Sequence, residues 1–157
     1  MKKILVIGAG RSATSLINYL LEHAGHDGFG VVVVDIDVNL AREKVGDRSG
    51  ATVFQLNIDD ASQRRKFISD SDIVISMLPP ALHYPVALDC LDLGRHMLTA
   101  SYLSEEIAHL DSEDRDKNLL FMTEMGLDPG IDHMSARRLI AEINDKSGMI
   151  SAFSSYT

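Results

Sequence analysis

The sequence predicts an α/β fold in which a parallel sheet carries helices on both faces. Short apolar runs alternate along the chain with longer segments whose apolar residues recur at helical spacing. The four consecutive valines Val31–Val34 are typical of a strand buried on both faces, as in parallel sheets. Because strands and helices alternate throughout, right-handed crossovers and a doubly wound parallel sheet are expected.

Each expected element follows from its local pattern. The strands are apolar runs that end near glycine, proline or polar residues, and they are expected at residues 4–7, 31–34, 52–56, 73–78, 97–100 and 119–122. The helices have apolar residues three or four positions apart or a capping signal, and they are expected at residues 12–24, 40–45, 60–68, 82–93, 104–117 and 134–143. Asp59 or Asp60 is placed to cap the third helix, and Pro79-Pro80 ends the fourth strand.

Composition restricts the class of partner. The 157 residues fit one domain, and 45% hydrophobic with 24% charged residues is ordinary for a soluble globular protein. The net charge of -8 argues against nucleic acid, because neutralising phosphates requires a basic surface. No apolar run approaches the ~20 residues of a membrane span, so no membrane partner is expected. The one cysteine, Cys90, is expected in the core and favours a reducing, cytoplasmic setting.

A glycine-rich turn joins the first strand to the first helix and matches the pattern G-x-G-x-x-A. Gly8 permits the tight turn, Gly10 lets a pyrophosphate approach the backbone, and Ala13 keeps the helix close to the sheet. The helix N-terminus adds free N–H groups and the positive end of the helix dipole. We therefore expect a Rossmann-like domain that binds a dinucleotide through Gly8, Ala9, Gly10, Arg11, Ser12 and Ala13.

Asp35 ends the second strand, where a carboxylate accepts hydrogen bonds from the adenosine ribose hydroxyls. A 2′-phosphate would face this carboxylate and be repelled, so NAD is expected as the cofactor and NADP is less favoured. Ile36 follows directly, and Asp37 is close enough to share the role. Arg11 or Arg42 could turn toward a phosphate, which leaves NADP as the open alternative.

Polar groups also lie toward the carboxyl ends of the fourth, fifth and sixth strands, at Ser76, at Ser101-Tyr102 and at Asp128. In open α/β sheets, ligands bind at the carboxyl ends of the strands. These groups are therefore expected to meet in one crevice. Met77 and Leu78 are expected either to pack on a ribose or ring or to belong to the core.

The turn at residues 124–133 is the most informative segment, because it concentrates glycine, proline, aspartate and histidine after a strand. Asp128 precedes Pro129, which biases it toward extended backbone. Asp132 is expected in the first turn of the last helix, where its charge matches the dipole, and His133 as a packed or capping residue.

Metal and hydrolase chemistry have little support in the sequence. His83, His96 and His109 are scattered and give no ligand spacing, so no metal is expected. No G-x-S-x-G elbow is present either.

The chain resembles saccharopine dehydrogenases of the glutamate-forming type. The likeness covers nearly the whole chain and is carried by residues 8–13, 76–79, 94–96, 99–104 and, most specifically, 124–133. Family members look like a Rossmann domain followed by an inserted substrate domain. The resemblance implies that residues 1–157 are the cofactor domain and that the substrate domain would follow residue 157. Residues 149–157 are expected to start another strand. Residues 153–157 resemble the strand that leads into the substrate domain in the family.

The resemblance implies an oxidoreductase of CH–NH groups in lysine metabolism, which converts saccharopine, NAD(P)+ and water to glutamate and 2-aminoadipate semialdehyde. By similarity, further cofactor contacts would come from Asp35, Ile36, Asp37, Asn57, Ile58, Ser76, Met77, Leu78, Ala100 and Ser101. The amino-acid substrate would contact Ser101, Tyr102, Asp128, Pro129 and Gly130. Asp128, or a residue of the absent domain, would move protons during imine hydrolysis, and this chain alone is expected to be inactive.

Relatives that use NADP tend to carry a serine-arginine ending on the second strand, where this chain has Asp35. Two alternatives remain open: a related imine-reducing polyamine enzyme of the carboxynorspermidine dehydrogenase type, and a non-catalytic nucleotide-sensing Rossmann domain. Residues 124–133 speak against the sensor, which has no need of a polar Asp-Pro-Gly turn. Tyr102 and the apolar groups near Pro79 offer a surface for homodimer formation.

Overall fold

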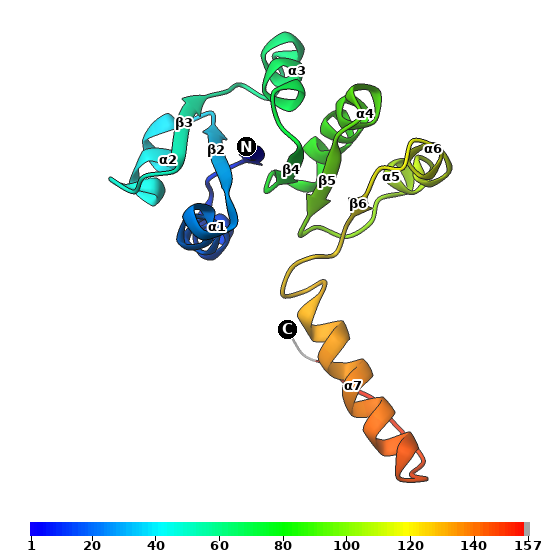
Figure 1. Cartoon of the computed structure of the whole chain (residues 1–157). Coiled ribbons are helices and arrows are strands. Elements are labelled where there is room, and N and C mark those ends of the chain that lie inside the picture. The colour runs from blue at the N-terminus through cyan, green and yellow to red at the C-terminus, as the bar shows by residue number, and fades with distance from the viewer. Residues whose placement is uncertain (156–157) are drawn as a thin grey trace.

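The computed structural model describes residues 1–155, and its centre is a six-stranded sheet (Figure 1). The strands are β1 (Lys2–Ile7), β2 (Phe29–Asp35), β3 (Ala51–Gln55), β4 (Ile73–Ser76), β5 (His96–Thr99) and β6 (Phe121–Met122). Their order is β3-β2-β1-β4-β5-β6, and all neighbouring pairs are parallel. Successive strands are added on one side of β1 as far as β3, and from β4 onward they are added on its other side. The predicted doubly wound, Rossmann-like sheet is therefore confirmed.

Helices cover both faces of the sheet (Figure 1). The helices are α1 (Thr14–Asp27), α2 (Val38–Val45), α3 (Ala61–Ser69), α4 (His83–Leu93), α5 (Glu105–Ala108), α6 (Asp111–Asp116) and α7 (Ile131–Asp145), with short 3-10 turns η1 (Arg11–Ala13) and η2 (Pro80–Leu82). Asp60 is the N-cap of α3, because its side chain accepts a hydrogen bond from Gln63 N. This confirms one of the two caps expected there.

One apolar core lies on each face of the sheet, and successive side chains of β1 point alternately into the two cores. Val6 points to the core under α1 and α2, where it packs with Ile17 and neighbouring residues. Leu5 points to the core under α3, α4 and α5, which includes Cys90. Burial raises the pKa of the Cys90 thiol to about 12, so Cys90 is a core residue, as expected, and an unreactive one.

The segment expected as one helix at residues 104–117 is two short helices, α5 and α6. Leu110 joins them with its backbone turned to a ψ of -11° and its side chain buried beside Ile107. The break places the acidic residues Asp111, Glu113 and Asp114 in the first turn of α6, where the helix dipole favours negative charge. The prediction of a single helix was therefore wrong.

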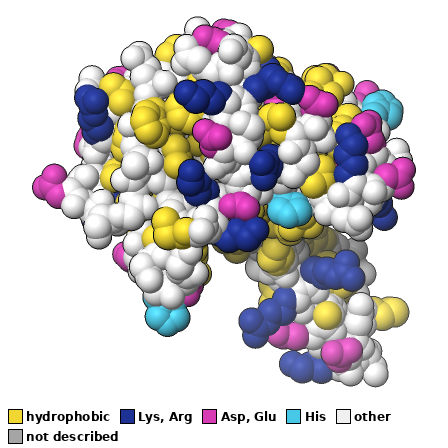
Figure 2. Space-filling model, turned by 45° about the horizontal axis from the view of Figure 1, so that its top comes forward, with side chains coloured by type: hydrophobic (Ala, Val, Ile, Leu, Met, Phe, Trp, Pro, Cys, Tyr) yellow, Lys and Arg dark blue, Asp and Glu magenta, His cyan; other side chains and the backbone are white. Residues whose placement is uncertain are grey.

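The C-terminal region also differs from expectation. β6 has two residues, where four were expected, and it pairs only with β5. Residues 149–155 form no strand, so the expected strand is wrong for these residues, and Tyr156-Thr157 lie outside the described part of the chain. α7 extends away from the sheet (Figures 1 and 2) and buries none of its residues.

On the face drawn in Figure 2, lysine and arginine side chains are interspersed with acidic and apolar ones rather than gathered in one patch. Within residues 1–155, no helix combines the length and the apolar composition needed to cross a bilayer.

Candidate functional site

The glycine-rich turn packs tightly against the end of β4. Gly8 has a φ of +100°, and a Cβ built on it would lie 2.8 Å from the carbonyl oxygen of Met77. Only glycine therefore fits this position without strain. Gly10, in contrast, has open space around its Cα, and it precedes η1 without any side-chain cap. The first N–H groups of η1 are left without side-chain partners at the helix end, which is the arrangement that holds phosphate groups.

Asp35 is fixed at the end of β2 by two backbone hydrogen bonds. Its Oδ2 accepts from Ala9 N at 2.6 Å, and its Oδ1 accepts from Asp37 N at 2.9 Å. The carboxylate is thus tied to the glycine-rich turn and to the start of α2. Asp37 has a different role, because its own side chain caps α2 by accepting from Asn39 N at 2.9 Å.

A first cleft of about 350 Å³ opens at the carboxyl ends of β1, β2 and β3. Of the residues expected to bind the cofactor, it is lined by Gly8, Gly10, Asp35, Ile36, Asn57, Ile58, Met77 and Leu78. The cleft therefore lies between the glycine-rich turn, the Asp35 carboxylate and the loop that follows β3. This combination fits the adenosine half of a dinucleotide.

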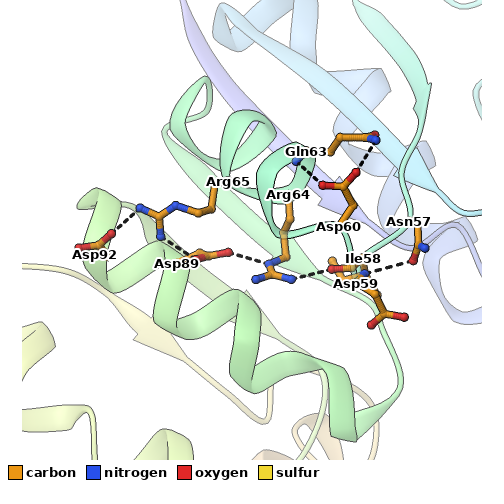
Figure 3. A network of polar contacts seen from close by, with 9 residues as sticks. All are labelled: Asn57, Ile58, Asp59, Asp60, Gln63, Arg64, Arg65, Asp89 and Asp92. Carbon is orange, nitrogen blue, oxygen red and sulfur yellow. Dashed lines mark hydrogen bonds and ion pairs between the residues drawn. The ribbon is translucent and has the colours of Figure 1, made fainter.

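A buried ion pair holds the loop after β3 in place (Figure 3). Arg64 of α3 donates from Nε to Asp89 of α4 at 2.6 Å and from Nη1 to the carbonyl oxygen of Ile58 at 2.6 Å. The side chains of Arg64 and Asp89 are only 11% and 9% exposed. Arg65 also binds Asp89, and it extends the network to the exposed Asp92. No sequence signal pointed to this network, because its partners lie 25 residues apart.

A second cleft of about 400 Å³ lies at the carboxyl ends of β4 and β5. Of the expected residues, it is lined by Ser12, Ser76, Met77, Leu78, Ala100, Ser101, Tyr102, Asp128 and Pro129. Met77 and Leu78 line both clefts and form the wall between them. The remaining expected residues, Ala9, Arg11, Ala13, Asp37 and Gly130, line neither cleft.

Behind the second cleft lies His83, one of the scattered histidines whose spacing in the sequence predicts no metal site. It is 2% exposed, and its ring bridges two serines. Nδ1 lies 2.8 Å from Ser76 Oγ, and Nε2 lies 2.8 Å from Ser101 Oγ and 3.3 Å from Thr99 Oγ1. Burial lowers the pKa of His83, so the ring is neutral at neutral pH.

Tyr102 and Asp128 meet at the mouth of the second cleft. The Tyr102 hydroxyl donates to Asp128 Oδ1 at 2.6 Å, although the two residues are 26 positions apart. Hydrogen bonding to this carboxylate raises the pKa of Tyr102, because the neutral phenol is the form that donates. The expected convergence of the fifth and sixth strand ends is therefore present in the structure.

The turn after β6 carries Asp128 to this place. Glu124 N donates to the Ser101 carbonyl oxygen and Met125 N to that of Thr99, which extends the pairing with β5. Gly130 has a φ of +144°, and a Cβ there would lie 2.2 Å from the carbonyl oxygen of Gly126. The turn thus closes on itself only with glycine at position 130.

Two side chains at the start of α7 complete the turn. Asp132 Oδ1 accepts from Gly130 N at 2.9 Å, and His133 Nδ1 lies 3.4 Å from the same N–H. The expected places of Asp132 in the first helical turn and of His133 as a capping residue are confirmed. Burial acts to raise the pKa of Asp132, but the N–H groups of His133 and Gly130 outweigh it, and the pKa is lowered.

A larger hollow of about 660 Å³ lies elsewhere, between α3 and the start of β2 and β3. It has no glycine-rich turn and lies away from the carboxyl edge, so it lacks the features of a dinucleotide site. Among residues 1–155, no group of three or more His, Cys, Asp or Glu side chains is arranged to hold a metal ion.

Comparisons with known proteins show which family the chain belongs to. Residues 4–122 match the family model described as the saccharopine dehydrogenase NADP binding domain. The chain is 32% identical over 155 residues to the NADP+, L-glutamate-forming saccharopine dehydrogenase of Saccharomyces cerevisiae. This match covers 99% of this chain and 34% of the relative. It is 36% identical over 126 residues to the alpha-aminoadipic semialdehyde synthase of Arabidopsis thaliana, which covers 80% of this chain and 12% of the relative.

A solved structure agrees with these sequence matches. Apo saccharopine dehydrogenase (L-Glu forming) from Saccharomyces cerevisiae superposes with a TM-score of 0.81 at 30% identity, covering 92% of this chain and 32% of that protein. This chain thus spans about a third or less of the length of these relatives. With the parallel sheet, the glycine-rich turn and the two adjoining clefts, these matches show that the chain is an NAD(P)-binding domain of the saccharopine dehydrogenase family.

Proposed function

We propose that the two clefts together bind NAD in preference to NADP, and that the chain supplies the cofactor-binding part of an enzyme that oxidises saccharopine. The observation that carries the cofactor preference is the fixed carboxylate of Asp35. Its bonds to Ala9 N and Asp37 N leave lone pairs for two ribose hydroxyls. A 2′-phosphate would bring further negative charge against a carboxylate that cannot turn away.

The shape of the carboxyl edge fits an extended dinucleotide. Adenosine would fill the first cleft, beside Asp35 and the loop at Asn57 and Ile58. The pyrophosphate would lie over Gly10, where nothing occupies the space above the Cα. The nicotinamide half would then pass the wall of Met77 and Leu78 into the second cleft.

The proposed reaction converts saccharopine, NAD+ and water to glutamate, 2-aminoadipate semialdehyde, NADH and a proton. NAD would supply the acceptor for the hydride on the carbon next to the secondary amine, and this chain would hold that acceptor in position relative to the substrate. Hydrolysis of the resulting imine requires a group that moves protons to and from water. The Asp128 carboxylate, paired with the Tyr102 hydroxyl at the mouth of the second cleft, is the candidate in this chain.

The substrate assignment is supported by the names of the relatives, which are saccharopine dehydrogenases and aminoadipic semialdehyde synthases. Since those proteins are about three or more times as long as this chain, we assign substrate binding mainly to a further domain like theirs. Residues 1–157 would form the cofactor domain. Tyr102 is 61% exposed, so it is available for contact with such a domain.

Parallel calorimetric titrations with NAD and NADP test the cofactor assignment directly. The unsubstituted chain should bind NAD clearly and NADP much more weakly. The double variant Asp35→Ser, Ile36→Arg should shift the preference toward NADP. As a matched control, Asp59→Ser removes another acid from the lining of the first cleft and should leave the ratio of the two affinities unchanged. An unaltered ratio in the double variant would show that Asp35 does not face the ribose.

A turnover assay tests the reaction. A protein in which this chain is joined to a substrate domain should reduce NAD when given saccharopine, whereas the 157-residue chain alone should bind NAD without turnover. Turnover by the chain alone would contradict the proposal that substrate binding depends on a further domain. Failure of the joined protein to reduce NAD with any amine substrate would favour a sensor.

A further inference from the structure

His83 lies behind the second cleft and joins the ends of two strands. It is the first residue of α4, the helix that follows β4 and the 3-10 turn η2. Its ring lies between Ser76, the last residue of β4, and Ser101, two residues beyond β5. Both serines line the second cleft, whereas His83 does not. Thr99, whose hydroxyl also contacts the ring, lines the cleft as well. The imidazole therefore acts on anything bound in the cleft only through the hydroxyls around it.

Two buried hydroxyls contact the ring, those of Ser76 and Thr99, and they compete for its one acceptor nitrogen. The contact from Ser76 is the shorter, at 2.8 Å against 3.3 Å, which favours Nδ1 as the acceptor. A neutral imidazole has one N–H and one acceptor nitrogen. Ser76 is 0% exposed, and its hydroxyl contacts His83 Nδ1 at 2.8 Å. If Nδ1 carried the proton, the Ser76 hydroxyl proton would point at no acceptor in a buried site, which is costly. The lower-energy arrangement has Ser76 donating to Nδ1, so that the ring proton is on Nε2.

The Nε2–H group then faces two hydroxyl oxygens. The shorter contact, 2.8 Å, is to Ser101 Oγ, and the longer, 3.3 Å, is to Thr99 Oγ1. Because Ser101 Oγ accepts this hydrogen bond, its own proton is left to point into the cleft. With the opposite tautomer, Ser101 would donate its proton to Nε2 and present only lone pairs to a ligand.

We propose that His83 is a positioning residue, which holds the Ser101 hydroxyl as a hydrogen-bond donor toward an oxygen acceptor on the nicotinamide half of the cofactor, its carboxamide carbonyl. This inference rests on the proposed function, since it needs the nicotinamide half in the second cleft. The hydrogen-bonded chain runs from Ser76 through His83 to Ser101 and ends at the ligand. His83 contacts neither cofactor nor substrate.

Comparing NAD with ADP-ribose isolates this contact, because ADP-ribose has the adenosine, pyrophosphate and second ribose but no nicotinamide. Calorimetry on the 157-residue chain should show that His83→Phe weakens NAD about fivefold, the value of one hydrogen bond. The same variant should change the affinity for ADP-ribose by less than about twofold. Ser101→Ala should have the same effect as His83→Phe. The double variant should be no weaker than either, because both remove the same interaction.

Two further variants separate positioning from a structural role. His96→Phe is the matched control, because it removes a histidine that bonds Leu120 N at the opposite end of β5; it should leave both affinities unchanged. His83→Gln keeps a donor at about the reach of Nε2 and should recover part of the NAD affinity. Equal weakening of NAD and ADP-ribose in both His83 variants would overturn the proposal in favour of a packing role.

The tautomer gives a readout that needs no ligand and no variant. In a long-range ¹H–¹⁵N spectrum of the unsubstituted chain, His83 should have the pattern of a neutral ring protonated at Nε2. A ring protonated at Nδ1 would overturn the proposal. Absence of NAD binding by the unsubstituted chain would instead contradict the proposed function. NAD binding that His83→Phe leaves unchanged would overturn only the role of His83.

Discussion

The two clefts are built from different interactions, although they share the wall of Met77 and Leu78. The first cleft is shaped by backbone geometry and by charge: a glycine with positive φ, a carboxylate held by two N–H groups, and the buried pair of Arg64 and Asp89. The second is shaped by neutral hydroxyls around one buried imidazole and by an exposed pair, Tyr102 and Asp128.

Because of this difference, the supports of the first cleft affect the stability of the domain, whereas the side chains at the mouth of the second cleft mainly affect the ligand. Breaking a buried ion pair or straining a backbone destabilises the whole domain, so Gly8 and the pair of Arg64 and Asp89, which support the first cleft, can change little without loss of stability. Changes to exposed hydrogen bonds at the mouth of the second cleft alter what a ligand meets, while the fold is hardly affected. Variants that affect each cleft can test this division.

The largest effect is expected at the ion pair below the first cleft. Asp89→Ala leaves Arg64 buried without its carboxylate, and losing one partner of a buried pair costs about 3–5 kcal/mol of unfolding free energy. Arg64, which donates to the Ile58 carbonyl oxygen, is then no longer fixed by Asp89. The loop beside the first cleft is held less firmly, so ADP-ribose affinity should fall. Urea unfolding and calorimetry measure the two effects. Asp92→Ala is the control, because Asp92 bonds the same network from an exposed position and its loss should leave the unfolding midpoint nearly unchanged.

A smaller but still general effect is expected at Gly8. Gly8→Ala forces a methyl group to within 2.8 Å of the Met77 carbonyl oxygen at a φ of +100°, and strained backbone of this kind costs about 1–3 kcal/mol. Both the thermal midpoint and NAD affinity should fall. Gly10→Ala should leave the midpoint unchanged, because its Cβ meets nothing within 4 Å, and should reduce affinity alone. Equal stability losses in the two variants would break the distinction drawn for the first cleft.

The smallest effect is expected at Tyr102. Its pKa is raised by the hydrogen bond to Asp128, so the neutral phenol is the favoured form in the folded chain. The hydrogen bond from Tyr102 to Asp128 therefore contributes fully to stability below the ordinary tyrosine pKa. This contribution is lost as pH rises through the raised pKa of Tyr102. Phenolate absorbance, taken as the difference from Tyr102→Phe, should show this raised pKa. Asp128→Asn should move it back toward the ordinary value, with the unfolding midpoint at neutral pH nearly unchanged.

The sequence allowed prediction of the features that depend on local pattern. The parallel sheet, its strand order class and the position of the glycine-rich turn follow from segments of fewer than ten residues. Asp35 could be placed because it directly ends the valine strand. The meeting of Tyr102 with Asp128 was also within reach, because the carboxyl ends of parallel strands lie at one edge. Their roles toward ligands stay predictions.

Features that depend on packing between distant segments could not be predicted. His83 contacts Ser101 because α4 lies over β4 and β5, and a separation of 18 residues carries no spacing signal. One clue was available: a histidine in the first turn of a crossover helix lies above the strand that precedes it. The division of residues 104–117 into two helices depends on the burial of Leu110, which helical periodicity alone does not reveal.

The contact between Gly8 and Met77 has a consequence for ligand size. Met77 N also donates to the Ile7 carbonyl oxygen at 2.8 Å, so the turn over which the pyrophosphate would lie and the wall between the clefts are parts of one rigid backbone unit. The distance from the Asp35 carboxylate to the second cleft is then set by the spacing of adjacent strands, and a flexible loop does not adjust it. In the proposed binding mode the domain would select by length, because a cofactor with a longer or shorter bridge between its two nucleosides could not fill both clefts together.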